Sequence, residues 1–101
     1  MAIIISDIHG DISKAKAFLA YKPEAEHVIL GDLMDSRDYG VTLDDELECL
    51  ELVLSSNAVL LWGNHDLAYT LKPCWEPYAR FKDTYAPVSE LIIPHQNRFK
   101  A

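Results

Sequence analysis

The chain is poor in the residues that define several protein classes. It has only two cysteines in 101 residues, Cys49 and Cys74, with no Cys-x-x-Cys spacing. A disulfide framework is therefore disfavoured, and we expect two reduced thiols. No apolar run approaches the roughly 20 residues of a membrane-spanning helix, and the opening residues 1–5 lack the basic start and long apolar region of a signal peptide. We therefore expect no membrane partner and a cytoplasmic location.

Positive charge is also scarce. Nine Lys and Arg residues stand against sixteen Asp and Glu, which gives a net charge of −7. Thirteen of those acids precede residue 72. Because nucleic acids and anionic membranes are bound mainly through Lys and Arg, this front part disfavours both partners. The hydrophobic share of 50% and the charged share of 25% are ordinary for a globular protein, and the length fits one domain with a modest core.

Three apolar runs each end in a turn that carries polar, chemically versatile side chains. The first turn, Ser6-Asp7-Ile8-His9-Gly10, follows residues 3–5; the second, Gly31-Asp32-Leu33-Met34-Asp35, follows residues 28–30; the third, Gly63-Asn64-His65-Asp66, follows residues 58–62. Glycine and asparagine alone would suffice to end a strand. Plain polar turns are therefore the simpler interpretation, but they do not require a histidine in both the first and the third turn.

Amphipathic segments separate the three runs. Asp11 can cap a helix that ends before Pro23, and Thr42 with Asp45 forms a capping-box pattern at the start of a second helix. The acids of this second helix are interpreted as a solvated face. The order is β-α-β-α-β, an α/β fold, and right-handed crossovers make the three strands parallel. All three turns should then meet at the carboxyl edge of one sheet, where ligands of open α/β sheets bind.

The pattern degrades after residue 71. Pro73, Pro77 and Pro87 punctuate a segment that is rich in aromatic residues, so we expect a single domain, 1–101, with a motif-bearing part at 1–71 and an irregular tail at 72–101. A short helix is expected around residues 76–83, and Leu91-Ile92-Ile93 is interpreted as a fourth strand, which Pro94 limits to an edge or a strand end. Four aromatic residues could line a substrate pocket, although a place in the core or on a surface left exposed by a missing second half is favoured: Trp62, Trp75, Tyr78 and Phe81.

The donors in the turns suit a hard or borderline metal ion. Asp7, His9, Asp32 and Asn64 offer oxygen and nitrogen, and no thiolate lies nearby to select a softer ion. Such a set favours manganese, iron or zinc. A carboxylate can also bridge two cations about 3.5 to 4 Å apart, the separation used by hydrolytic dinuclear sites.

In this order and spacing, Asp7-Ile8-His9, Gly31-Asp32-x-x-Asp35 and Gly63-Asn64-His65-Asp66 resemble the first three motifs of the calcineurin-like metallophosphoesterases. The resemblance covers roughly the first 70 residues. It implies the β-α-β-α-β half of a metallophosphoesterase sandwich, and it implies hydrolysis of phosphate mono- or diesters by a hydroxide that bridges two divalent metal ions.

The resemblance also implies roles for single residues. Asp7 and His9 would bind the first metal, Asp32 would bridge both metals, and Asn64 would bind the second. His65 would protonate the leaving oxygen as general acid, with Asp35 orienting its ring. Asp66 takes the place of the Asp or Glu that ends the third motif, where it would support the ligands from behind.

Arg37 resembles the phosphate-binding arginine of the protein-phosphatase branch. In that branch the arginine directly follows the second aspartate of the motif, whereas Ser36 intervenes here. Two interpretations stay open: a contact to the substrate phosphate, or a charge on the loop surface.

The chain departs from the family pattern in its second part. Family members continue with further metal-binding histidines, and here only His95 lies beyond His65. A solvent-facing role is the favoured interpretation of His95. The chain therefore resembles the amino-terminal part of a metallophosphoesterase with the second half missing. An alternative function is a non-catalytic remnant that binds metal or a partner, including a homo-oligomer formed through the exposed half sheet.

Overall fold

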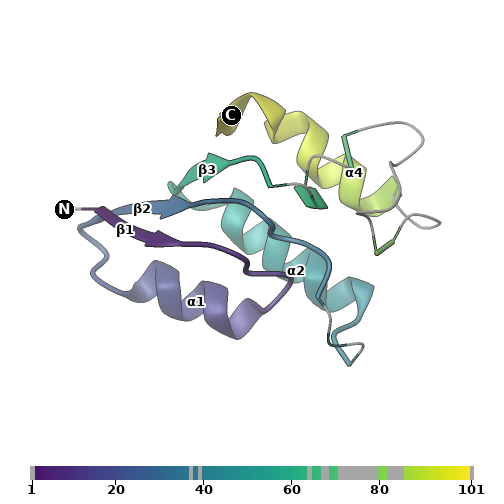
Figure 1. Cartoon of the computed structure of the whole chain (residues 1–101), viewed down its shortest axis with the longest axis horizontal. Helices are drawn as coiled ribbons and strands as arrows, with labels where there is room; N and C mark the ends of the chain where they lie inside the picture. Colours follow the sequence, from purple (N-terminus) through teal and green to yellow (C-terminus); the bar gives the residue numbers. More distant parts are fainter. Residues whose placement is uncertain are drawn as a thin grey trace.

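The structure is a computed structural model that describes residues 2–36, 38, 40–63, 65–66, 69–70, 80–81 and 86–100. Its elements in chain order are β1 (Ala2–Ile5), α1 (Ile12–Ala20), β2 (Glu26–Ile29), α2 (Leu43–Leu54), β3 (Val59–Leu61), α4 (Ala86–Ile92), the 3-10 helix η1 (Ile93–Arg98) and β4 (Phe99–Lys100). Figure 1 shows this path from the amino terminus to the carboxyl terminus.

The strands form one parallel sheet in the order β1-β2-β3-β4. The register pairs Ile4 with Val28, Val28 with Val59, and Leu60 with Phe99. The α/β class and the three parallel strands that the sequence predicts are therefore confirmed. Strands in sequential order with right-handed crossovers place their connecting helices on one face of the sheet, and α1 and α2 indeed pack against each other.

Side-chain caps start both helices where the sequence predicts. Asp11 accepts a hydrogen bond from the backbone N–H of Lys14 at the start of α1. Thr42 and Asp45 form the reciprocal capping box of α2, which pairs two backbone N–H groups that would otherwise lack a partner. Three acids in the first turn of α2 add favourable charge at the positive end of the helix dipole.

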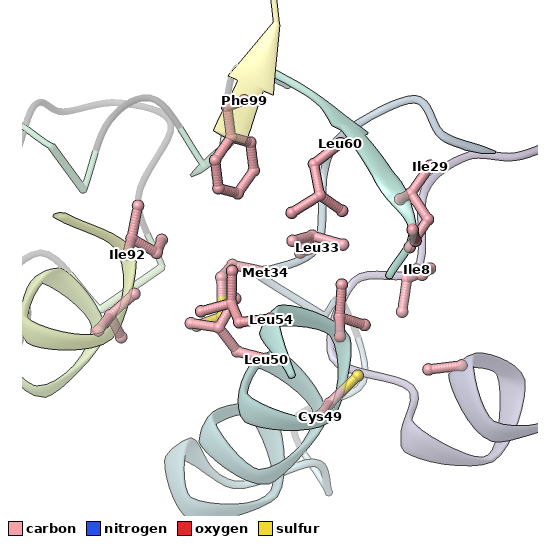
Figure 2. Packing of buried hydrophobic residues seen from close by; sticks show 14 of the residues in the cluster. Ile8, Ile29, Leu33, Met34, Cys49, Leu50, Leu54, Leu60, Ile92 and Phe99 are labelled. Carbon is pink, nitrogen blue, oxygen red and sulfur yellow. The ribbon is translucent and has the colours of Figure 1, made fainter. Parts of the chain in front are cut away.

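The core lies between the sheet and α2, with α4 closing one side (Figure 2). Leu50 of α2, Leu60 of β3 and Ile92 of α4 are all fully buried. Three further core residues, Ile8, Leu33 and Met34, come from the first and second turns. Because these apolar residues alternate with the polar ones, their burial fixes the backbone of each turn to the core.

The opposite face of the sheet is partly open. Ile4 and Leu30 are 62% and 45% exposed, and the register sets Val28 and Val59 beside Ile4 on that side. Within the part of the chain that the structure describes, no helix is long and apolar enough to cross a membrane.

The prediction of a fourth strand at Leu91-Ile92-Ile93 is wrong. Leu91 and Ile92 belong to α4, and Ile93 begins η1. Val88, Ser89 and Ile92 are the buried residues of α4, which is helical spacing, and an apolar run of three cannot distinguish a strand from a helix. The fourth strand is Phe99–Lys100.

The expected helix around 76–83 falls mostly outside the described residues, and so do Trp75 and Tyr78. The aromatic residues Trp62 and Phe81 pack against the core, as favoured. The division at residue 71 stays a prediction, although the described part of the tail contains α4, η1 and β4.

Candidate functional site

The first and second turns continue the parallel hydrogen bonding of β1 and β2. The backbone N–H groups of Asp7, His9 and Gly10 donate to the carbonyls of Gly31, Asp32 and Leu33 at 3.3, 2.9 and 2.7 Å. This ladder extends beyond the strand ends and holds the two polar turns side by side.

Glycines bring the third turn against the second. A Cβ on Gly63 would lie 2.2 Å from the backbone nitrogen of Asp32, and a Cβ on Gly31 would lie 2.5 Å from the nitrogen of Gly63. No other residue fits at either position without movement of the backbone. In this close approach the backbone N–H of His65 donates to Asp32 Oδ1 at 3.1 Å.

The turns adopt a backbone conformation that L-residues rarely take. Five non-glycine residues of the described chain have a positive φ, and four of them are Asp7, His9, Asp32 and Asp35. Such strained conformations persist only where the surrounding structure enforces them, and they cluster at functional sites. The backbone therefore marks the same residues as the sequence motifs do.

Three of the predicted metal ligands come together. One ligand atom each from Asp7, His9 and Asp32 lies within 4.8 Å of the other two. The His9 ring donates from Nδ1 to the carbonyl of Met34 at 2.6 Å, which leaves the lone pair of Nε2, 3.5 Å from Asp7 Oδ1, for coordination. Two carboxylates and a histidine held in the correct tautomer fit a divalent cation.

The His65 imidazole lies beside this group. Its ring centroid is 5.2 Å from that of His9, with the planes perpendicular. His65 Nδ1 lies 2.8 Å from Asp35 Oδ2, and the Asp35 side chain is only 3% exposed. The carboxylate therefore accepts a hydrogen bond from the Nδ1–H of His65, which fixes the orientation of the imidazole ring.

A buried acid holds the Asp35 backbone in place. Glu46 of α2 is fully buried, and its Oε1 accepts from the N–H groups of Asp35 and Ser36 at 2.6 and 3.2 Å. Arg80 donates to Glu46 Oε2 at 2.8 Å and to the carbonyl of Val41 at 2.8 Å. Burial raises the pKa of Glu46, and the two backbone N–H groups and Arg80 oppose that shift.

Asp66 links the third turn to the second. Its Oδ1 accepts from the N–H of Leu33 at 2.7 Å. The whole side chain is buried, and among the described residues its Oδ2 has no hydrogen-bond partner. Burial, aided by the negative charge of Asp32, raises the pKa of Asp66 to about 7.

Some expected site residues are not placed. Asn64 and Arg37 lie outside the described residues. His95 belongs to η1, which leads into β4. Because β4 is parallel to β3, His95 lies at the amino edge of the sheet, opposite the polar turns.

Three residues of the site escape sequence reasoning. Glu46 was expected on a solvated face with the other acids of α2, and that prediction is wrong because Glu46 is fully buried. Tyr69 and Arg80 lie outside the three motifs. The one local signal is the position of Tyr69, four residues after His65, where one helical turn returns to the same side.

A family model described as calcineurin-like phosphoesterase matches residues 2–100 of the chain. No curated protein and no solved structure matches this chain. The family match agrees with the parallel sheet, the three polar turns and the candidate metal group at its carboxyl edge. The chain belongs to the calcineurin-like phosphoesterase family.

Proposed function

We propose that this site hydrolyses phosphate mono- or diesters with the help of two divalent metal ions. The observation that carries the proposal is the convergence of Asp7, His9 and Asp32 within 4.8 Å, next to the paired His65 and Asp35. Metal donors and a supported histidine at one sheet edge are the elements that hydrolysis of a phosphate ester needs.

The metal ions would be held by Asp7, His9 and Asp32, with Asn64 as the proposed further ligand. Manganese, iron and zinc suit these donors. When bound, such ions lower the pKa of a water molecule to give a nucleophile at neutral pH and neutralise the phosphoryl oxygens. One oxygen of Asp32 accepts from the backbone N–H of His65 at 3.1 Å, which restricts the side-chain conformation of this carboxylate, the group that would bind both ions.

His65 is the proposed general acid. Because Nδ1 faces Asp35 at 2.8 Å, a proton for the leaving oxygen would come from Nε2. The Asp35 carboxylate stabilises the charged ring that holds this proton. Arg37, one residue further along the loop than in the protein phosphatases, is proposed as a contact to the substrate phosphate.

A turnover assay tests this function. The full chain is incubated with manganese and a nitrophenyl phosphate ester, and release of nitrophenol is followed. We expect slow turnover that is lost in Asp32→Asn and in His65→Gln. Asp44→Asn, which removes an exposed charge of α2, is the matched control and should keep the wild-type rate. Equal rates in Asp32→Asn and wild type would contradict the proposal.

The second candidate is a module that binds metal without hydrolysis. The observation that favours it is the small ligand set: among the described His, Cys, Asp and Glu residues, the candidate group has three members, and His95 lies at the opposite sheet edge. Saturable metal binding without turnover of any phosphate ester would support this candidate over the enzyme.

A homo-oligomer is the proposed partner arrangement in that case. The exposed apolar side chains of Ile4 and Leu30 on the open sheet face support it, because a second copy would remove them from water. Sedimentation of the full chain distinguishes the states, and a monomer at all concentrations would contradict self-association.

A further inference from the structure

Tyr69 is the most deeply buried aromatic residue near the site, with no exposed surface. Its hydroxyl donates to Asp35 Oδ1 at 2.5 Å and accepts from the backbone N–H of Phe81 at 3.0 Å. Its carbonyl accepts from Ser89 Oγ of α4 at 2.5 Å. Tyr69 is therefore held by hydrogen bonds at both its hydroxyl and its main chain.

The two carboxylate oxygens of Asp35 therefore have different hydrogen-bond partners. Oδ1 accepts from Tyr69 and Oδ2 faces His65 Nδ1. Because the Asp35 side chain is 3% exposed, water does not readily replace a partner that is lost. A carboxylate held at both oxygens keeps one rotamer, so the hydroxyl of Tyr69 determines which oxygen meets the imidazole.

We propose that Tyr69 is a positioning residue that acts through Asp35 to hold the His65 ring with its Nδ1 proton directed at the carboxylate. The inference rests on the proposed function of His65 as general acid. Tyr69 itself contacts neither substrate nor metal in this assignment.

A plain core role is the competing explanation, because a buried tyrosine also stabilises the fold by packing. The two explanations differ in what the hydroxyl does. Tyr69→Phe keeps the ring and its packing but leaves Asp35 Oδ1 without this donor. A core role predicts a lower melting temperature and an unchanged His65 ring, whereas positioning predicts a changed ring in a chain that still folds.

Nuclear magnetic resonance of the metal-free full chain with ¹⁵N-labelled histidine measures the ring directly. The chain has four histidines, and the signal that disappears in His65→Gln is that of His65. In wild type we expect a protected Nδ1 proton on His65, and we expect Asp35→Ala to abolish it. In Tyr69→Phe this proton should exchange with water about tenfold faster or more, as expected for the loss of one hydrogen bond to a charged group.

Tyr21→Phe is the matched control. Tyr21 is 59% exposed at the end of α1, so loss of its hydroxyl should leave the His65 signal unchanged. An unchanged Nδ1 signal in a folded Tyr69→Phe chain overturns the proposal. If Tyr69→Phe does not fold, Ser89→Ala loosens the same tyrosine through its carbonyl and must also speed the exchange; no change in that variant equally overturns it.

Manganese-dependent turnover adds an independent readout. Loss of positioning should lower kcat more for phenyl phosphate, whose leaving group needs the proton, than for nitrophenyl phosphate, with KM unchanged. An equal loss on both esters would indicate a merely structural role and contradict the proposal. If the wild-type chain turns over neither ester, the proposed function fails, while the ring measurement still decides whether Tyr69 positions His65.

Discussion

Asp35 is held by contacts from three other residues, one in α2 and two in the segment that follows β3. Glu46 of α2 accepts from its backbone N–H, while Tyr69 and His65 contact its two carboxylate oxygens. Its φ of 69° lies in the left-handed region, which is uncommon for a residue with a side chain and persists where such contacts support it. At the level of single residues, the candidate site is therefore a set of polar contacts that are buried and mutually dependent.

Replacing Glu46 tests this dependence. Glu46→Ala should destabilise the chain by about 3 kcal/mol, because two backbone N–H groups and the Arg80 guanidinium lose a buried acceptor. Glu46→Gln keeps one oxygen as acceptor and should cost clearly less. Urea unfolding measures both. Glu48→Ala, an exposed acid of the same helix, is the control, and equal losses in Glu46→Ala and Glu48→Ala would contradict this assignment.

Asp66 should make the stability of the metal-free chain depend on pH. Its pKa rises from 3.8 to about 7 on folding, so between those values the native state holds more protons than the unfolded state. The stabilisation is complete below the lower value and is lost as pH rises through about 7.

Asp66→Asn removes this dependence and keeps an oxygen for the N–H of Leu33. At about pH 8 the variant should be more stable than wild type by roughly 2 kcal/mol or more, and the difference should shrink as pH falls toward 4. Thermal unfolding at a series of pH values measures it. A constant difference across the series would argue against a buried, proton-binding Asp66.

The candidate metal ligands can be predicted from the sequence, whereas the buried residues that hold the site in place cannot. Asp7, His9 and Asp32 are recognisable because each follows an apolar run, and parallel strands bring their ends together. Glu46 could not be distinguished from its solvated neighbours, because its burial depends on Arg80, far along the chain. Tyr69 lies outside the three motifs, and only its spacing of four residues from His65 points to a contact with Asp35.

At the level of elements, the second and third turns depend on close backbone contact. Gly63→Ala places a methyl group against Asp32 and should destabilise the chain by about 1–3 kcal/mol, the usual cost of overpacking. It should also weaken metal binding, because Asp32 must move. Gly40→Ala is the matched control: among the described residues its Cβ would meet only the side chain of Asp38, with Oδ1 nearest at 3.1 Å. Denaturation curves in which both alanine variants match wild type would contradict this packing.

Helices with side-chain caps were predicted correctly, whereas short apolar runs were not. Asp11 and Thr42 begin α1 and α2 because each pairs backbone N–H groups locally. The run at residues 91–93 carries no comparable local signal: only Ile92 is buried, and it belongs to α4, which packs against α2. Local hydrogen bonding can be recognised in the sequence, but tertiary packing of a short run cannot.

At the level of the whole molecule, the segment after residue 71 contributes to the site. Arg80 donates to the carbonyls of Ser36 and Val41 and to Glu46, and Ser89 holds the main chain of Tyr69. The loop between β2 and α2 is thus held by hydrogen bonds from Glu46 of α2 and from Arg80 of the later segment. The parallel strands bring the polar turns to one edge of the sheet. Arg80 and Ser89 of the later segment stabilise the residues that hold Asp35.

Metal binding tests the central claim most directly. Manganese is titrated into the metal-free chain by calorimetry, with wild type, Asp32→Asn and the surface control Asp44→Asn compared under the same conditions. We predict weak, saturable binding in wild type and in Asp44→Asn, and its loss in Asp32→Asn. No saturable heat in wild type, or equal binding in Asp32→Asn, would contradict a metal site at Asp7, His9 and Asp32.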